Sequence, residues 1–134
     1  MITEYDERVN TGNFKEAKKA GKEALNYIRK HFMEYAKPPE IRGYDYKFSP
    51  YVFRDVFDKQ ILKYGFEIDE RTHTHAYGIG NNNKWDIVDS NMNKVGEFRA
   101  NNNMYHGVYI NVSIKDEHFD GFEICSGGFI REKE

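Results

Sequence analysis

The sequence predicts an α+β fold in which two N-terminal helices pack on one face of an antiparallel meander sheet of about five strands. Three observations lead to this prediction. Up to about residue 65, apolar residues recur every three or four positions, which is the period of an amphipathic helix. Beyond it they alternate every two positions, the period of a half-buried strand. Proline, glycine and asparagine stand where these periodic segments are expected to end.

The first helix is expected over residues 13–36, with Asn13 as N-cap and Glu16 as its capping-box partner. Its apolar stripe consists of Phe14, Ala17, Gly21, Ala24, Leu25, Ile28, Phe32 and Tyr35. Because three of these residues are small, a neighbour should pack close against the helix. We expect that neighbour to be the chain's own sheet; the alternative is the seam of a coiled-coil dimer, which leaves a homodimer open. Pro38-Pro39 should end the helix.

A tyrosine-rich loop at 40–48 precedes the second helix. Ser49-Pro50 suits a helix start, with serine as N-cap and proline at the first helical position. The expected buried face consists of Val52, Phe53, Val56, Phe57, Gln60, Ile61 and Tyr64. Gly65 is the expected C-cap.

The strands are expected near 67–79, 84–89, 94–100, 106–115 and 121–125, with a sixth candidate at 128–131. The fourth is the clearest, since Val108, Ile110, Val112 and Ile114 alternate with Tyr109, Asn111, Ser113 and Lys115. Turns are expected at Asn81-Asn82-Asn83, Ser90-Asn91-Met92-Asn93, Asn101-Asn102-Asn103 and Ser126-Gly127-Gly128.

Length and composition favour one domain over residues 1–134, with an N-terminal extension at 1–12, a helical part at 13–65 and a β part at 66–131. Hydrophobic residues make up 39% of the 134 and charged residues 31%, which suits a globular chain. No secretory signal and no apolar run of membrane-spanning length, about 18 residues, is present, so we expect a cytoplasmic protein with no membrane partner. Cys125 is the single cysteine, and its apolar neighbours predict a buried core thiol.

The sequence carries no recognisable nucleophile, phosphate-binding or dinucleotide motif. We therefore expect a protein that is not an enzyme and needs no cofactor. The nearest approach to a site is His73 and His75, whose side chains share one face of a strand about 7 Å apart. As weak metal candidates they need a third ligand, for which Asp86, Glu97 and His106 are the options.

Charge suggests two partner-binding surfaces. Residues 1–65 carry a net charge of +3 and residues 66–134 a net charge of −5, which can steer an oppositely charged partner. The predicted acidic surface consists of Asp116, Glu117, Phe119, Asp120 and Glu123, in which carboxylates surround an aromatic anchor. The predicted basic surface consists of Lys15, Lys18, Lys19, Lys22, Arg29 and Lys30, with Tyr44 and Tyr46 as stacking platforms for nucleic acid.

The leading functional hypothesis is a small non-enzymatic binding protein that inhibits or sequesters a macromolecular partner. Its size and composition resemble those of an anti-defence protein of a mobile element, such as an anti-CRISPR inhibitor of a nuclease, so the partner would belong to a nucleic-acid-processing complex. A toxin-immunity protein is an alternative of the same class. The alternatives from other classes are a nucleic-acid-binding module using the first helix and a small metal-dependent enzyme centred on His73 and His75.

Overall fold

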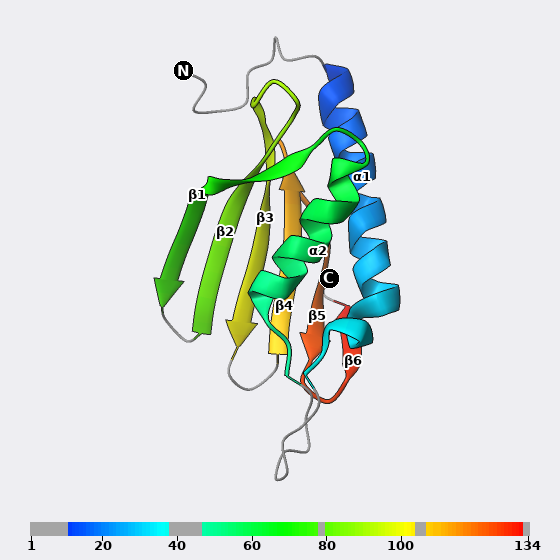
Figure 1. Ribbon diagram of the computed structural model, residues 1–134, viewed down its shortest axis with the longest axis vertical. Helices are drawn as coiled ribbons and strands as arrows, with labels where there is room; N and C mark the ends of the chain where they lie inside the picture. Colours follow the sequence, from blue (N-terminus) through cyan, green and yellow to red (C-terminus); the bar gives the residue numbers. More distant parts are fainter. Residues whose placement is uncertain (1–10, 38–46, 78–79, 104–106, 133–134) are drawn as a thin grey trace.

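The computed structural model describes residues 11–37, 47–77, 80–103 and 107–132. The helices are α1 (Thr11–His31), the short 3-10 helix η1 (Phe32–Tyr35) and α2 (Pro50–Leu62). The strands are β1 (Glu67–Tyr77), β2 (Gly80–Val88), β3 (Lys94–Asn103), β4 (Gly107–Ile114), β5 (Glu117–Cys125) and β6 (Phe129–Glu132). They form one antiparallel sheet in sequence order; α2 crosses in front of its middle strands and α1 runs along the side of β5 and β6 (Figure 1). None of the described helices is long and apolar enough to cross a membrane.

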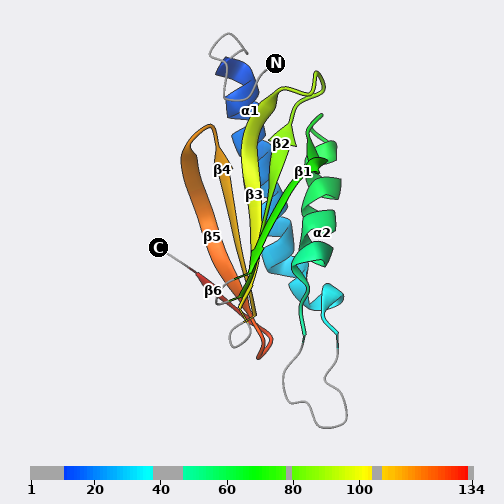
Figure 2. The same cartoon turned by 90° about the vertical axis from the view of Figure 1, so that its left-hand side faces the viewer.

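The predicted α+β architecture is confirmed, with the sixth candidate strand present. Figure 2 shows α2 beside one face of the sheet, and a single hydrophobic core fills the space between the helical layer and the strands. At its centre the Phe57 ring of α2 stacks on Phe98 of β3, with centroids 4.4 Å apart. The opposite face of the sheet, called the open face below, carries no described helix.

The predicted N-cap is wrong, because α1 begins at Thr11 and Asn13 lies within its first turn. The capping-box role expected of Glu16 is lost with it. Instead, Asn13 Nδ2 donates a hydrogen bond of 2.9 Å to Asp89 Oδ2, in the turn between β2 and β3. Asp89 is buried and also accepts from the backbone N–H groups of Asn91 and Asn93. Asn13 therefore fastens the start of α1 to a turn of the sheet.

The small residues of α1 pack against the chain's own sheet, as expected, rather than forming a dimer seam. A Cβ added to Gly21 would lie 3.1 Å from Phe119 Cζ and 3.5 Å from Val112 Cγ1. The α-helix ends at His31 and not at 36, because its last turn tightens into η1. Pro38-Pro39 and residues 40–46 of the tyrosine-rich loop lie outside the described residues.

The predicted start of α2 is confirmed, since the backbone N–H of Tyr51 donates to Ser49 Oγ at 3.2 Å and Pro50 opens the helix. Of its predicted buried face, Phe53, Val56, Phe57 and Ile61 are buried. Tyr64 was wrongly included: it is 39% exposed, since the helix stops at Leu62. Gly65 is not the C-cap that was predicted, because Lys63 holds that position; Gly65 follows two residues later with φ +86°, a conformation that glycine adopts readily.

Two of the four predicted turns are confirmed and two are wrong. Met92 (φ 65°) and Gly128 (φ +90°) lie in turns between strands, as expected. The segments 81–83 and 101–103, however, are strand residues of β2 and β3, in which Asn81 pairs with Asn102 and Asn82 with Asn101. Strand β5 also begins at Glu117, four residues earlier than expected. The strands extend past their apolar residues because cross-strand pairing satisfies backbone groups whatever the side chain.

Gly96 of β3 leaves no room for a side chain against β4. A Cβ there would lie 2.2 Å from the backbone oxygen of Ser113. We predict that Gly96→Ala lowers the free energy of unfolding by about 3 kcal/mol, because backbone must move to admit the methyl group. The matched control is Gly127→Ala, whose Cβ would meet only the exposed ring of Phe129. Urea titration followed by circular dichroism measures both, and equal effects would contradict the prediction.

Candidate binding surface

Five described asparagine side chains gather at one end of β2 and β3. We call this group, Asn81, Asn82, Asn83, Asn101 and Asn102, the asparagine patch. Asn81 pairs with Asn102 across the two strands, and Asn82 pairs with Asn101. Because side chains alternate along a strand, Asn82 and Asn101 lie on the open face while the others lie on the helix side. The patch thus presents amide groups on both faces of the sheet.

On the open face the patch borders a shallow groove of about 210 Å³. The groove crosses β1, β2 and β3, and its lining includes Thr74, Asn82, Lys84, Arg99 and Asn101. Asn82 and Thr74 are exposed, and the other three are partly exposed. Amide, hydroxyl and cationic groups converge there, so the groove can donate hydrogen bonds to carbonyl or carboxylate oxygens of a ligand.

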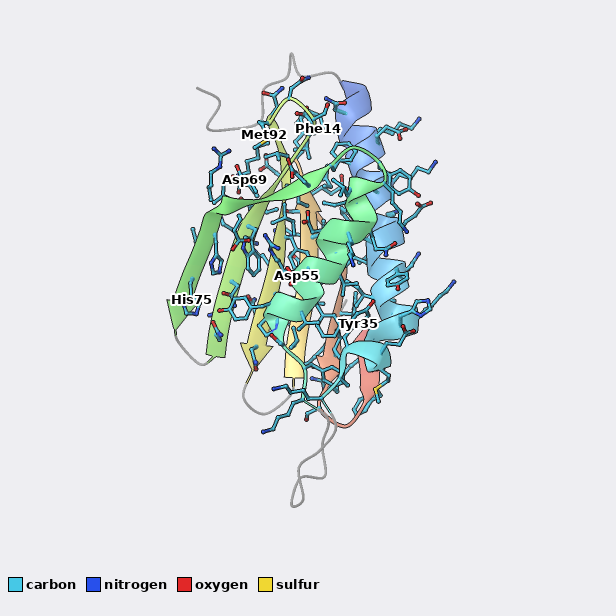
Figure 3. The ribbon with its side chains drawn as sticks, in the orientation of Figure 1. Phe14, Tyr35, Asp55, Asp69, His75 and Met92 are labelled. Atoms are coloured by element: carbon cyan, nitrogen blue, oxygen red, sulfur yellow. The ribbon has the colours of Figure 1, made fainter. Side chains whose placement is uncertain are left out.

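On the helix side the two histidines of β1 are held by the patch. The His73 ring stacks on Trp85, with centroids 4.5 Å apart and planes within 8°, and His73 Nε2 donates to Asn83 Oδ1 at 2.8 Å. Asn83 is only 2% exposed, and its Nδ2 in turn donates to Ala100 O at 3.3 Å. His75, labelled at the sheet edge in Figure 3, hydrogen-bonds Asn81. These imidazoles are therefore ordered parts of the surface.

The structure does not assemble the expected metal ligands around the histidines. The carboxylates of Asp86 and Glu97 contact Lys94, and they lie on the open face, opposite His73. Across the described residues no cluster of three or more histidine, cysteine or acidic side chains could hold a metal ion. The suggestion that Asp86 or Glu97 supplies the third ligand is therefore wrong, and His106 lies outside the described residues.

Beside the groove, on the open face, the Glu97 carboxylate forms ion pairs with three cationic side chains. Its carboxylate accepts hydrogen bonds from Lys84 at 3.2 Å, Lys94 at 2.9 Å and Arg99 at 2.9 Å. Burial acts to raise the pKa of Glu97, but Lys94 and Lys84 outweigh it and hold that pKa below its ordinary value of 4.5. Burial raises the pKa of neighbouring Asp86, against the attraction of the same lysines. Glu97 thus fixes the cations that border the groove.

The depressed pKa of Glu97 predicts a pH-dependent contribution to stability. A carboxyl whose pKa is lower in the folded than in the unfolded chain stabilises the fold above its unfolded pKa, and this is lost as the pH falls through the folded pKa. We predict that Glu97→Gln costs about 1–2 kcal/mol of unfolding free energy at neutral pH, and that this cost shrinks progressively as the pH falls through the lowered pKa of Glu97.

The measurement is urea unfolding of both proteins from neutral to acid pH. Asp55→Asn is the control, because Asp55 is exposed on α2. A difference between wild type and Glu97→Gln that stays constant across the acid range would contradict the prediction.

The residues of the predicted acidic surface are not brought together on one face. Phe119 packs against Gly21 on the helix side, whereas Glu123 is 4% exposed and pairs with Arg131 on the open face. Glu117 forms an ion pair of 2.8 Å with Lys18. Asp116 and Asp120 are exposed. The exposed negative charge is therefore smaller than the sequence suggests.

The predicted basic surface is partly neutralised in the same way, because α1 lies along β5 and β6. Arg29 pairs with Glu132 at 2.9 Å, donates to the backbone oxygen of Asp120 and lies over the Phe122 ring. Lys18 is held by Glu117. The exposed cations of the face are Lys15, Lys19, Lys22 and Lys30. Tyr44 and Tyr46 lie outside the described residues.

A hollow of about 310 Å³ lies among α1, η1 and α2, and its lining includes Tyr27, Tyr35, Val52 and Lys59. The hydroxyls of Tyr27 and Tyr35 lie 3.3 Å apart, and this hydrogen bond, together with burial, raises the pKa of Tyr35 to about 12. Tyr35 therefore stays a neutral phenol at physiological pH. Asp55 and Gln60 also line this hollow, so it too carries polar groups beside its apolar wall.

Cys125 is buried as predicted, but it lies outside the main core. It follows Ile124, whose side chain is in the core, and its Sγ lies 4.0 Å from Glu123 Oε1. The alternation of the strand places the thiol with Glu123 on the open-face side.

Sequence reasoning missed the asparagine patch because asparagine is rare in strands and common in turns. A signal was nonetheless present: the two asparagine runs stand symmetrically about the predicted turn at Ser90–Asn93, as residues paired across a hairpin must. Tyr51 was also missed as a neighbour of His73, with ring centroids 6.1 Å apart. Comparisons with protein-family models, curated proteins and solved structures find no match to this chain.

The stack of His73 on Trp85 predicts unequal roles for the two histidines. We expect His73→Ala to lower the unfolding free energy by about 2 kcal/mol, because it removes a ring contact and leaves buried Asn83 with an unpaired acceptor. His75→Ala, at a more exposed position, should cost less than half as much. Thermal and urea unfolding measure both, and a larger loss for His75→Ala would refute this assignment.

Proposed function

We propose that this chain is a small binding protein that inhibits or sequesters a protein partner, and that the asparagine patch with its groove is the surface that contacts the partner. The observation that carries the proposal is the position of the patch. Asparagine disfavours strands, so paired asparagines in β2 and β3 lower local stability without adding to the core. Departures from local structural preference are expected at functional surfaces.

The chemistry of the patch suits a protein partner. An amide side chain donates and accepts hydrogen bonds and carries no charge, so it matches the backbone and polar side chains of another protein. Tyr51 and His75 add exposed aromatic surface next to it. Surfaces that combine tyrosine with small amide residues are typical of antibody-like recognition.

Two buried nitrogen atoms that lack hydrogen-bond partners in the described part of the chain lie close to the patch. The buried Nε1 of Trp85 and Nε of Arg54 have no hydrogen-bond partner among the described residues. An unsatisfied buried donor costs about 1–3 kcal/mol, and such groups concentrate where function constrains the sequence. Because Trp85 stacks on His73, which hydrogen-bonds Asn83 of the patch, the unsatisfied donors also favour this part of the molecule as the binding surface.

The partner class we favour is a nucleic-acid-processing enzyme, such as a nuclease of a bacterial defence system. A small protein without its own chemistry can inhibit such an enzyme by occupying its substrate channel. The competing proposal, a nucleic-acid-binding module on α1, depends on the four exposed lysines of that face. The two differ in their response to salt, because phosphate contacts weaken steeply as salt rises.

Site-specific cross-linking tests the proposal. A photoreactive residue is placed, in separate variants, at Asn82 in the patch, Asp116 in the predicted acidic surface and Lys19 on the basic face. Each tagged protein is exposed to lysates of bacteria carrying defence systems. We expect a protein cross-link from the Asn82 position that survives nuclease treatment. A protein cross-link from Asp116 alone would move the interface to β5, and nucleic acid at Lys19 would favour the alternative.

Substitution of the patch gives the quantitative check. The double variant Asn82→Ala, Asn101→Ala should weaken retention of the captured protein by about tenfold, as expected for two interface hydrogen bonds. Asn26→Ala is the matched control, since Asn26 is an exposed asparagine on α1. Equal retention by the double variant and the control would rule out the patch as the contact surface.

A further inference from the structure

The two edge strands of the sheet are protected to very different degrees. Strand β6 has four residues, and its Arg131 and Glu132 pair with Glu123 and Arg29. Strand β1 has eleven residues and is the other edge strand of the six-stranded order. Charged residues at 67–71 and an irregular register with β2 between Asp69 and Thr74 protect its first half, but its segment 72–76 contains no lysine, arginine, acidic residue or proline. Soluble proteins normally protect a long edge strand with such residues, because its unpaired backbone groups recruit another strand.

The segment 72–76 is also accessible. Thr74, His75 and Ala76 are exposed, and Thr72 and His73 are partly exposed. In Figure 1 the lower half of β1 forms the left border of the sheet, and α2 crosses nearer the middle strands. Figure 2, seen from that side, shows β1 in front with α2 to one side of it. An added strand would therefore meet neither described helix.

The order of residues in this segment is close to a palindrome. Thr72-His73-Thr74-His75-Ala76 reads His-Thr-His in both directions about Thr74. An antiparallel pair related by a two-fold axis at Thr74 would place His73 opposite the partner's His75, and Thr74 opposite the partner's Thr74. Threonine pairs and aromatic pairs are favourable when directly opposite on one face of a sheet. A two-fold interface requires this kind of self-complementarity.

We propose that residues 72–76 of β1 pair with the same segment of a second copy of this chain, giving a two-fold dimer with a continuous twelve-stranded sheet. The His-Thr-His sequence at 73–75 favours a second copy over a strand of another protein, because a two-fold axis at Thr74 places the same residue types opposite each other. The pairing places the two asparagine patches on either side of the dimer axis, separated by the two β1 strands. The argument for this dimer uses only the edge strand β1, so it does not depend on the proposed function.

Charge placed on the axis tests this arrangement directly. Thr74→Lys sets two ammonium groups opposite each other, and Thr74→Glu sets two carboxylates opposite each other. Each variant should raise the dimer dissociation constant about tenfold, measured by sedimentation equilibrium. An equimolar mixture of the two variants should recover the wild-type constant, because lysine then faces glutamate. Only pairing of position 74 with itself predicts this recovery.

Phe129→Lys is the control, since it places the same charge on the exposed part of the opposite edge strand. It should leave the dissociation constant unchanged, and circular dichroism should show each variant folded. A monomeric wild type, no recovery in the mixture, or dissociation caused by Phe129→Lys would overturn the proposal. If the chain is monomeric and Thr74→Lys also abolishes the cross-linked protein, Thr74, which lines the groove, contacts that partner instead, and self-pairing is equally overturned.

Discussion

The packing of α2 across the sheet, centred on the stack of Phe57 with Phe98, is the constraint on which the rest of the structure depends. It buries the apolar side of the central strands, which is the main favourable contribution to folding. It also fixes where the N-terminal part of α2 lies, and hence brings Tyr51 to Trp85, with ring centroids 6.2 Å apart. The cluster of Tyr51, His73 and Trp85 at β1 and β2 therefore depends on the packing of α2 at the centre of the sheet.

The position of α1 follows from the same core and determines the surface charge. Because α1 lies along β5 and β6, its cations meet the carboxylates of those strands, as Lys18 meets Glu117 and Arg29 meets Glu132. Exposed ion pairs of this kind add little stability. Their larger effect is that cations of the first half of the chain neutralise carboxylates of the second half. The two halves differ in net charge in the sequence, but this difference is smaller on the folded surface. The surface is therefore distinguished more by its hydrogen-bonding groups than by a separation of net charge.

The open face of the sheet is polar yet sheltered. Asn111, Ser113 and Glu123 on this face are each less than a tenth exposed, and Glu97 is held by three cations. Such groups are stable only when their hydrogen bonds are satisfied. The result is a rigid polar platform beside the groove at the asparagine patch. A preformed surface loses less conformational entropy on binding, which favours recognition by polar groups.

The sequence by itself determined the fold class, the start of α2 and the apolar face of β4, because periodicity and capping are local properties of neighbouring residues. Only the tertiary structure decided that the runs at 81–83 and 101–103 are strands, since pairing between them overrides the turn preference of asparagine. It likewise placed Asn13 on Asp89, His73 on Trp85, and Glu123 on the face opposite Phe119. Each of these positions depends on which distant segments meet, and no local pattern records that information.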